Sequence, residues 1–175
     1  MLAASLAARL ALSWLAAFAL APFAIGLVSY PVVLARFDYA QLRSGMGDHW
    51  VAGGAIAISA LPCAAIAQAA MITHTLGAAY GTLRAGSVVL WALAIAWLPI
   101  LVVAEVRWPR PRYDIRRWAT VFPLGMIAVM SVAVGEVSGE NWIRAFGEGW
   151  AWVALTAWLV VAAGAVRQAR VPAVR

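Results

Sequence analysis

Residues 116–136, RRWATVFPLGMIAVMSVAVGE, decide the class of fold. Two arginines precede an apolar run that contains Phe-Pro-x-Gly near its start and ends at Glu136. About 20 mostly apolar residues, rising 1.5 Å each, form a helix that crosses roughly 30 Å of hydrocarbon. This run has that length, so it predicts a membrane-spanning helix.

The rest of the chain has the same character. Of its 175 residues, 65% are hydrophobic and 11% are charged, and the mean hydropathy is +0.88. A soluble domain cannot bury so much apolar surface in one core. Five apolar runs of spanning length are present, at about 11–35, 50–71, 86–106, 117–136 and 148–166.

These runs predict an all-α fold, a polytopic helical bundle in the membrane. Backbone groups in lipid must be satisfied internally, and the runs are too long and too weakly alternating for barrel strands. The connections between them are too short for a soluble domain, so we expect residues 1–175 to form a single transmembrane domain. The first run also imitates a signal peptide, with Arg9, an apolar stretch and Ala19-Leu20-Ala21. Its hydrophobicity continues to Ala35, which favours a spanning helix.

The charge pattern excludes one class of function and predicts an orientation. All 13 basic residues are arginines and the net charge is +6, but they lie at the ends of the apolar runs, so nucleic-acid binding is not expected. Short loops rich in arginine tend to stay cytoplasmic. An outside amino terminus places ten arginines on the cytoplasmic side and three outside. We therefore expect a multi-pass protein of the cell membrane with a cytoplasmic carboxyl terminus.

The five spans differ in composition. Tryptophans are concentrated in the first, third and fifth, whereas the second and fourth contain small residues, namely Gly53, Gly54, Ser59, Gly125, Ser131 and Gly135. Small residues let helices approach closely or leave open space between them. We therefore place the second and fourth spans inside the bundle. Ordinary close packing and the lining of a pore both remain open as explanations.

Phe122 and Pro123 stand out in the fourth span. A proline inside a helix removes a backbone donor and kinks the chain, and the freed carbonyls can line a path for solute. An aromatic residue before such a proline usually packs against its neighbours. Apolar side chains can also close a pore by excluding water. Packing and gating are therefore both considered for Phe122.

Few residues suggest other chemistry. Asp114 is placed to cap the fourth helix, and Glu105 is expected to pair with an arginine such as Arg107 rather than to carry protons. His49 and His74 are far apart and lack further metal-ligand residues at a suitable spacing. No hydroxyl or thiol nucleophile lies near a recognisable base. We predict no enzyme activity, no metal and no cofactor.

Three segments resemble a known family. They are SWLAAFALAPFAIGLVSYPVVL at 13–34, GDHWVAGGAIAISAL at 47–61 and RYDIRRWATVFPLGMIAVMSVAVG at 112–135. The chain is similar over essentially its whole length to the tellurite-resistance and C4-dicarboxylate transporter family, which includes the plant slow-type anion channels. The segment containing VFPLG is the most specific part of this resemblance.

The resemblance implies half of a ten-helix pore fold. Family members arrange ten helices as five hairpins around a central pore, and this chain corresponds to helices six to ten. The second and fourth spans then match the seventh and ninth helices, which line the pore. An amino-terminal half or a partner chain is expected to supply the remaining helices. Several members form trimers, so a homo-oligomer is a further expectation.

The resemblance also implies a site and a function. Phe122 matches a phenylalanine that occludes the family's pore, and the pore-lining or kink candidates are Pro123, Gly125, Ser131, Gly53, Gly54 and Ser59. The expected cytoplasmic basic mouth consists of Arg112, Arg116 and Arg117. The expected substrates are C4-dicarboxylates, tellurite-related oxyanions or small inorganic anions, carried across the lipid bilayer. The alternative is a non-conducting membrane subunit or remnant that packs against a partner.

Overall fold

The computed structural model describes residues 2–10, 12–38, 40, 48–109 and 113–170. Within these residues, five helices are long and apolar enough to cross a membrane. The predicted helical membrane fold is therefore confirmed. The five helices are α2 (Ser13–Ala35), α4 (Asp48–Thr73), α5 (Ala79–Arg107), α6 (Trp118–Ser138) and α7 (Asn141–Ala169).

Two helices begin well before the expected spans. α5 begins at Ala79 and α7 at Asn141, in segments whose glycines and charges resemble loops. In α7, Arg144 Nε donates to Glu148 Oε1 at 2.8 Å, one helical turn further on. In α5, the guanidinium of Arg84 donates to the carbonyl of Ser138 at the end of α6. Polar side chains in these segments are thus satisfied without breaking the helices.

A short helix, α1 (Leu2–Leu10), precedes α2 and was not predicted. Ala4 and Ala7 are fully buried, and Ala7 packs with Ala16 of α2 and Ala69 of α4. The amide of Leu12 donates to the carbonyl of Ala7 at 3.1 Å, which closes the turn between α1 and α2. Alanine lets the three backbones approach closely because its side chain is a single methyl group.

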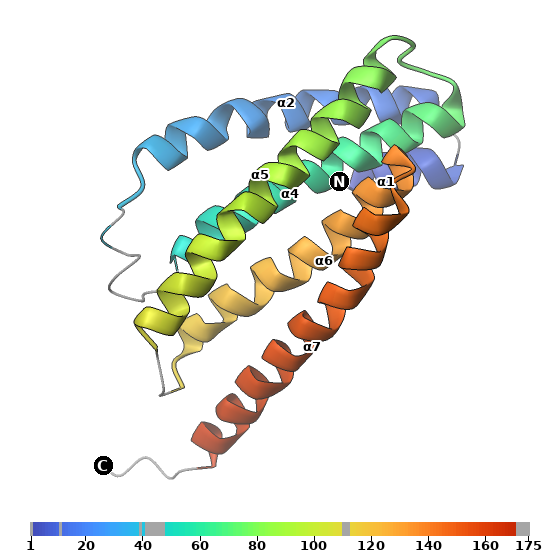
Figure 1. Cartoon of the computed structure of the whole chain (residues 1–175). Helices are drawn as coiled ribbons and strands as arrows, with labels where there is room; N and C mark the ends of the chain where they lie inside the picture. Colours follow the sequence, from blue (N-terminus) through green and yellow to red (C-terminus); the bar gives the residue numbers. More distant parts are fainter. Residues whose placement is uncertain (1, 11, 39, 41–47, 110–112, 171–175) are drawn as a thin grey trace.

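α4 and α6 form the centre of the bundle. Figure 1 shows them running in the same direction, while α2, α5 and α7 run the opposite way. α5 packs on both central helices, α7 packs along α6, and α2 packs on α4 and α1. The most apolar windows of α4 and α6 are 50% buried, against 33% for α5 and 6% for α2 and α7. The inner position expected for the second and fourth spans is confirmed.

Glycines allow the central helices to approach their neighbours. A Cβ atom at Gly54 would lie 2.9 Å from Cγ of Pro123, where α4 meets α6. A Cβ atom at Gly53 would lie 2.6 Å from Cδ1 of Trp97, where α4 meets α5. Both distances are shorter than real carbon contacts. Gly53 and Gly54 therefore serve close helix packing.

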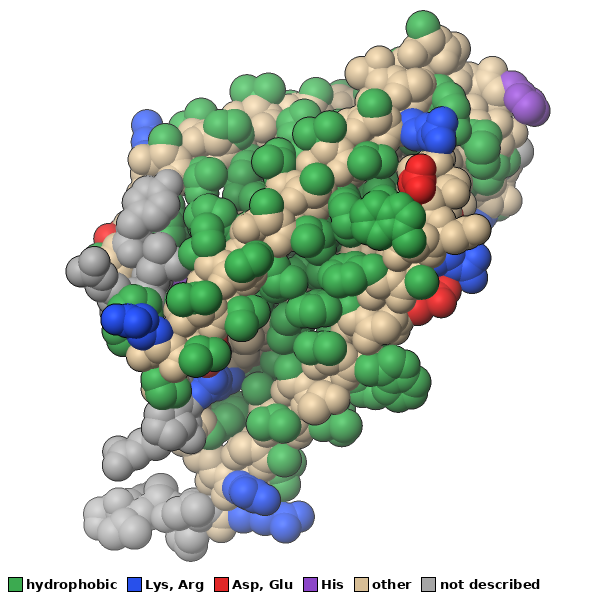
Figure 2. All heavy atoms as spheres, in the orientation of Figure 1, with side chains coloured by type: hydrophobic (Ala, Val, Ile, Leu, Met, Phe, Trp, Pro, Cys, Tyr) green, Lys and Arg blue, Asp and Glu red, His purple; other side chains and the backbone are tan. Residues whose placement is uncertain are grey.

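α6 and α7 form a tight hairpin. Gly139 follows α6 with a φ of 76°, the left-handed conformation that commonly ends a helix. Further along the pair, a Cβ atom at Gly147 would lie 2.8 Å from the carbonyl oxygen of Ala128. In the space-filling view, hydrophobic side chains cover the middle of the visible face and charged ones lie toward its ends (Figure 2). This distribution suits a bundle that is surrounded by lipid.

Candidate pore face and basic end

One face of α6 is not covered by any described helix. Phe122 is 57% exposed and Val129, two turns further on, is also exposed. Gly125, Met126 and Ala133 flank them and are partly exposed. These five residues, which we call the open face of α6, recur at spacings of three, four and seven and so share one side of the helix. An apolar stripe is therefore exposed on a helix whose other sides are buried.

Ser131 lies on the opposite side of α6. It is nine residues from Phe122, which corresponds to a rotation of about 180° at 3.6 residues per turn. Its hydroxyl accepts a hydrogen bond from Trp91 Nε1 of α5 at 2.8 Å and donates to the carbonyl of Ile127 at 2.7 Å. Ser131 is completely buried. Its small side chain therefore serves the contact with α5 in the described chain.

α4 contributes a matching exposed stripe. Val51, Ile58 and Ile72, which we call the open face of α4, are exposed and separated by multiples of seven. Val51 and Ile58 border the grooves between α4 and α2. Gly53 faces Trp97 of α5, and Ile58 is five residues away, about 140° around the helix. The open faces of both central helices thus turn away from α5, which covers their other side.

Pro123 and Phe122 point in different directions although they are neighbours in sequence. Pro123 is buried against Gly54 of α4, whereas Phe122 is exposed. The ring of Phe122 is therefore not a core side chain of the described chain. A Cβ atom at Gly125 would meet nothing within 4 Å, so the space beside Phe122 is open.

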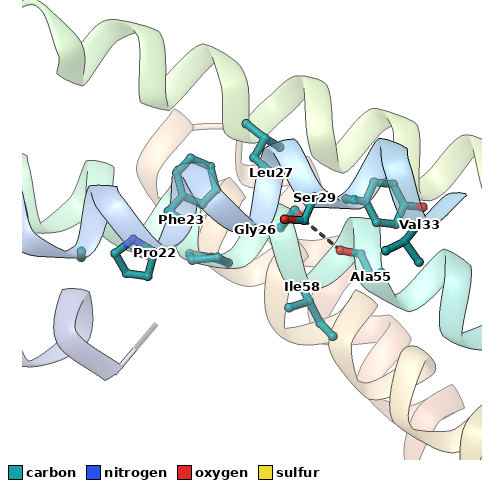
Figure 3. Close-up of a pocket in the computed structure, with 12 residues that line it drawn as sticks. Pro22, Phe23, Gly26, Leu27, Ser29, Val33, Ala55 and Ile58 are labelled. Atoms are coloured by element: carbon teal, nitrogen blue, oxygen red, sulfur yellow. Dashed lines mark hydrogen bonds between the residues drawn. The ribbon is translucent and has the colours of Figure 1, made fainter. Parts of the chain in front are cut away.

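A groove of about 440 Å³ lies between α2 and α4. Figure 3 shows residues that line it from both helices, including Pro22, Phe23 and Val33 of α2 and Ile58 of α4. Ser59 also lines this groove, and its hydroxyl donates to the carbonyl of Ala55 at 3.0 Å. Of the small residues proposed for the pore, Ser59 thus faces α2 and Gly125 lies on the open face of α6.

At the arginine-rich end of the bundle, an ion pair joins α5 to the segment that leads into α6. Glu105 of α5 accepts from Arg117 Nη1 at 2.8 Å with one oxygen and from Trp50 Nε1 at 3.3 Å with the other. The acidic group therefore pairs across helices with Arg117 rather than with its neighbour Arg107. Both side chains of the ion pair are about one quarter exposed, at 22% for Arg117 and 25% for Glu105.

The other residues of the predicted basic mouth differ in their setting. Asp114 Oδ1 accepts from the amide of Arg116 at 2.7 Å, which confirms the predicted cap, here on the short 3-10 helix η1 (Ile115–Arg117) that leads into α6. Arg116 is exposed. Arg112 lies outside the described residues. Among the described residues, no three His, Cys, Asp or Glu side chains are grouped to hold a metal ion.

Sequence reasoning missed an aromatic cluster between α5 and α7. The ring of Trp91 lies edge-on to that of Trp142, with centroids 5.3 Å apart, and Phe146 stacks on Trp150 at 5.5 Å. Trp91 is buried, although the tryptophan-rich spans were expected to face lipid. The i, i+4 spacing of Trp142, Phe146 and Trp150 was the available signal, because residues so spaced share one helix face.

The fold defines a polytopic helical membrane protein in which α6 leaves an apolar face uncovered and exposed residues of α4 border the grooves beside α2. Residues 1–166 match the sequence profile of the voltage-dependent anion channel family, and the chain belongs to that family. This confirms the resemblance to the transporter family that includes the slow-type anion channels.

Two relatives carry little functional information of their own. The chain is 35% identical over 140 residues to an uncharacterized membrane protein of Mycobacterium tuberculosis strain CDC 1551 / Oshkosh, covering 74% of this chain and 68% of the relative. The same values hold for an uncharacterized membrane protein of strain H37Rv. No solved structure matches the chain.

Proposed function

We propose that the chain is a transport subunit for small anions, in which the open faces of α4 and α6 form part of an apolar pore wall and Phe122 is the gate. The exposed ring of Phe122 carries this proposal. It is 57% exposed on one of the two most buried spans, in a member of the voltage-dependent anion channel family. Its neighbour Pro123 packs against Gly54, which supports the backbone that presents the ring.

A phenylalanine can gate anions without a charge. An apolar ring at a narrow point excludes water, and a hydrated anion cannot cross a dry constriction. Removing the ring widens the path and lets water enter. The same reasoning favours transport over catalysis, since the open faces offer apolar surface and no reactive group.

The basic end gives the proposed pore its preference for anions. Arg112, Arg116 and Arg117 would raise the local concentration of anions at the entrance, with Glu105 neutralising part of that charge through Arg117. C4-dicarboxylates, tellurite-related oxyanions and small inorganic anions all fit this field. We place this end in the cytoplasm and the amino terminus outside a cell membrane, following the distribution of arginines.

Two helices cannot enclose a water-filled path in a bilayer, because their uncovered faces would meet lipid. The open faces therefore require further helices. We propose that an amino-terminal half or a partner chain supplies them, and that the protein also forms a homo-oligomer, as the trimeric members of the family do.

Anion flux from liposomes tests the proposal. The chain is purified in mild detergent together with the chains that copurify, and efflux of chloride, nitrate and malate is compared for wild type, Phe122→Ala and Phe18→Ala. Phe18 of α2 is also an exposed phenylalanine, at 62%, and serves as the matched control. We expect Phe122→Ala to raise flux about tenfold, which corresponds to about 1.4 kcal/mol off the barrier, and Phe18→Ala to leave flux unchanged.

The other outcomes separate the remaining possibilities. Equal flux in Phe122→Ala and wild type would reject the gate and retain transport. An absence of flux in all samples would favour a non-conducting subunit, which the exposed apolar helix faces also fit because they could receive a partner's helices. From the chain alone we expect no selective flux.

A further inference from the structure

A basic pocket lies at the arginine-rich end of the bundle. Its volume is about 420 Å³, and it is formed by the segment before α6 and the last turns of α7. The polar groups that line it are Tyr113, Arg117 and Arg167, and the apolar groups include Val160 and Val161. Two guanidinium groups and a phenol thus share one cavity with an aliphatic wall.

Close packing forms the floor of this pocket. The ring of Tyr113 lies over Gly164 of α7, where an added Cβ atom would be 2.7 Å from Cδ2 of the ring. The hydroxyl of Tyr113 accepts from Trp118 Nε1 at 3.3 Å, and the ring of Trp118 lies edge-on to Trp158 of α7. Trp118, five residues further on, and Gly164 of α7 therefore hold Tyr113 in place.

The charges of the pocket are only partly neutralised. Arg117 donates one hydrogen bond to Glu105 through Nη1. Because a guanidinium has five N–H donors, its remaining donors are available to a ligand. The ion pairs of Arg117 with Glu105 and of Arg144 with Glu148 do not involve Arg167. The pocket is therefore suited to an anionic group.

The position of the pocket along α7 indicates an amphipathic ligand. α7 has 29 residues and is about 43 Å long, which exceeds the roughly 30 Å of hydrocarbon. Arg167 lies in its last turn, at the level of the lipid headgroups, and Val160 lies two turns deeper on an exposed side. In Figure 2, basic side chains at the end of α7 lie beside hydrophobic ones. Tyrosine and tryptophan are also enriched at this level of membrane proteins.

We propose that this pocket binds an anionic phospholipid, with its phosphate at Arg167, Arg117 and the hydroxyl of Tyr113 and an acyl chain along Val160 and Val161. The bound lipid joins the start of α6 to the end of α7. The site shares Arg117 with the proposed basic mouth, but lipid binding there does not require transport. The arginines of the pocket complement the negative charge of a phosphate, and its aliphatic wall, which faces the hydrocarbon, suits an acyl chain.

Native mass spectrometry of the full chain in detergent tests the site. The chain is titrated with phosphatidylglycerol, phosphatidylcholine or inorganic phosphate, using wild type, Arg167→Gln, Arg167→Lys and Arg170→Gln. Arg170 is a matched control because it is exposed, three residues from Arg167, and does not line the pocket. Thermal unfolding without added lipid verifies that the variants fold equally.

We expect wild type to prefer phosphatidylglycerol over phosphatidylcholine. Arg167→Gln should weaken phosphatidylglycerol binding about fivefold, the effect of about 1 kcal/mol for one basic residue near the headgroups. Arg167→Lys and Arg170→Gln should retain binding. Gly164→Ala provides a second variant, because displacing the Tyr113 ring should weaken binding without a change of charge.

Three results would overturn the proposal. Equal losses in Arg167→Gln and Arg170→Gln would indicate diffuse attraction to the surface rather than a site. Equal binding of the two lipids would show that the headgroup charge is not recognised. Displacement of phosphatidylglycerol by inorganic phosphate would indicate a site for a free anion instead of a lipid.

Discussion

Phe122 and Ser131 lie on opposite sides of α6. The ring of Phe122 projects from the open face, while the hydroxyl of Ser131 is hydrogen-bonded to Trp91 in the core at 2.8 Å. α6 therefore has a face that holds the bundle together and a face that the described helices leave uncovered. Substitutions on the two faces are expected to affect different properties.

Ser131→Ala is expected to lower stability by about 1 kcal/mol. The substitution removes the acceptor of the buried Trp91 N–H, and hydrogen bonds between membrane helices contribute on average about 0.6 and at most about 1.7 kcal/mol. Thermal unfolding in detergent measures the change. Thr156→Ala is the control, since Thr156 makes an exposed bond to its own helix at Trp152. Equal losses in the two variants would contradict the role assigned to the Trp91 contact.

Gly54→Ala is expected to lower the free energy of unfolding by about 1–3 kcal/mol, the usual cost of overpacking. The added Cβ atom would meet Pro123 at 2.9 Å, so α4 and α6 must separate. Gly125→Ala is the matched variant, because its Cβ atom meets nothing within 4 Å and alanine favours the helix by about 1 kcal/mol. If Gly125→Ala unfolds as readily as Gly54→Ala, the difference assigned to the two faces is wrong.

Gly147→Ala is expected to weaken the hairpin of α6 and α7 more than Gly149→Ala. A Cβ atom at Gly147 would lie 2.8 Å from the backbone of both Ala128 and Val132, and backbone atoms cannot move aside as a flexible side chain can. Gly149 has open space at its Cβ position. Proteolysis in detergent and thermal unfolding should both rank the variants in this order. A reversed order would show that the hairpin is not packed through Gly147.

Glu105→Gln is expected to destabilise the arginine-rich end by about 1–3 kcal/mol, because Arg117 loses a charged partner in a largely buried setting. Glu148→Gln breaks an exposed pair with Arg144, and such pairs contribute about 0.3–0.5 kcal/mol. Unfolding in detergent compares the two. A loss for Glu105→Gln no larger than that for Glu148→Gln would mean that the ion pair does not tie α5 to α6.

The class of fold could be predicted from the sequence. Runs of spanning length can be counted directly, and the small residues of the second and fourth spans indicated the central helices correctly. Helix ends were less accurate. α5 and α7 extend through segments with glycine and charge, because Arg84 finds a partner at Ser138 on another helix and Arg144 pairs with Glu148 one turn further along α7.

The candidate site residues were predicted from their residue types. The side of the helix on which each of them lies could not be predicted in this way. Small side-chain size made Gly53, Gly54, Ser131 and Gly125 equal candidates for lining a pore. A glycine that admits a neighbour and a glycine that leaves a space have the same composition. Only the placement of α5 and Pro123 separates them, since contact depends on what lies opposite.

The sequence by itself determined that this chain crosses the membrane as helices, since apolar length is a local property and lipid admits few spanning structures. It also carried the motif that identifies the family. The tertiary structure alone decided that Glu105 pairs with Arg117, that Tyr113 lies on Gly164 and that Phe122 faces outward while Ser131 faces inward. These relationships join separate helices, and a contact of this kind exists only once the helices have packed.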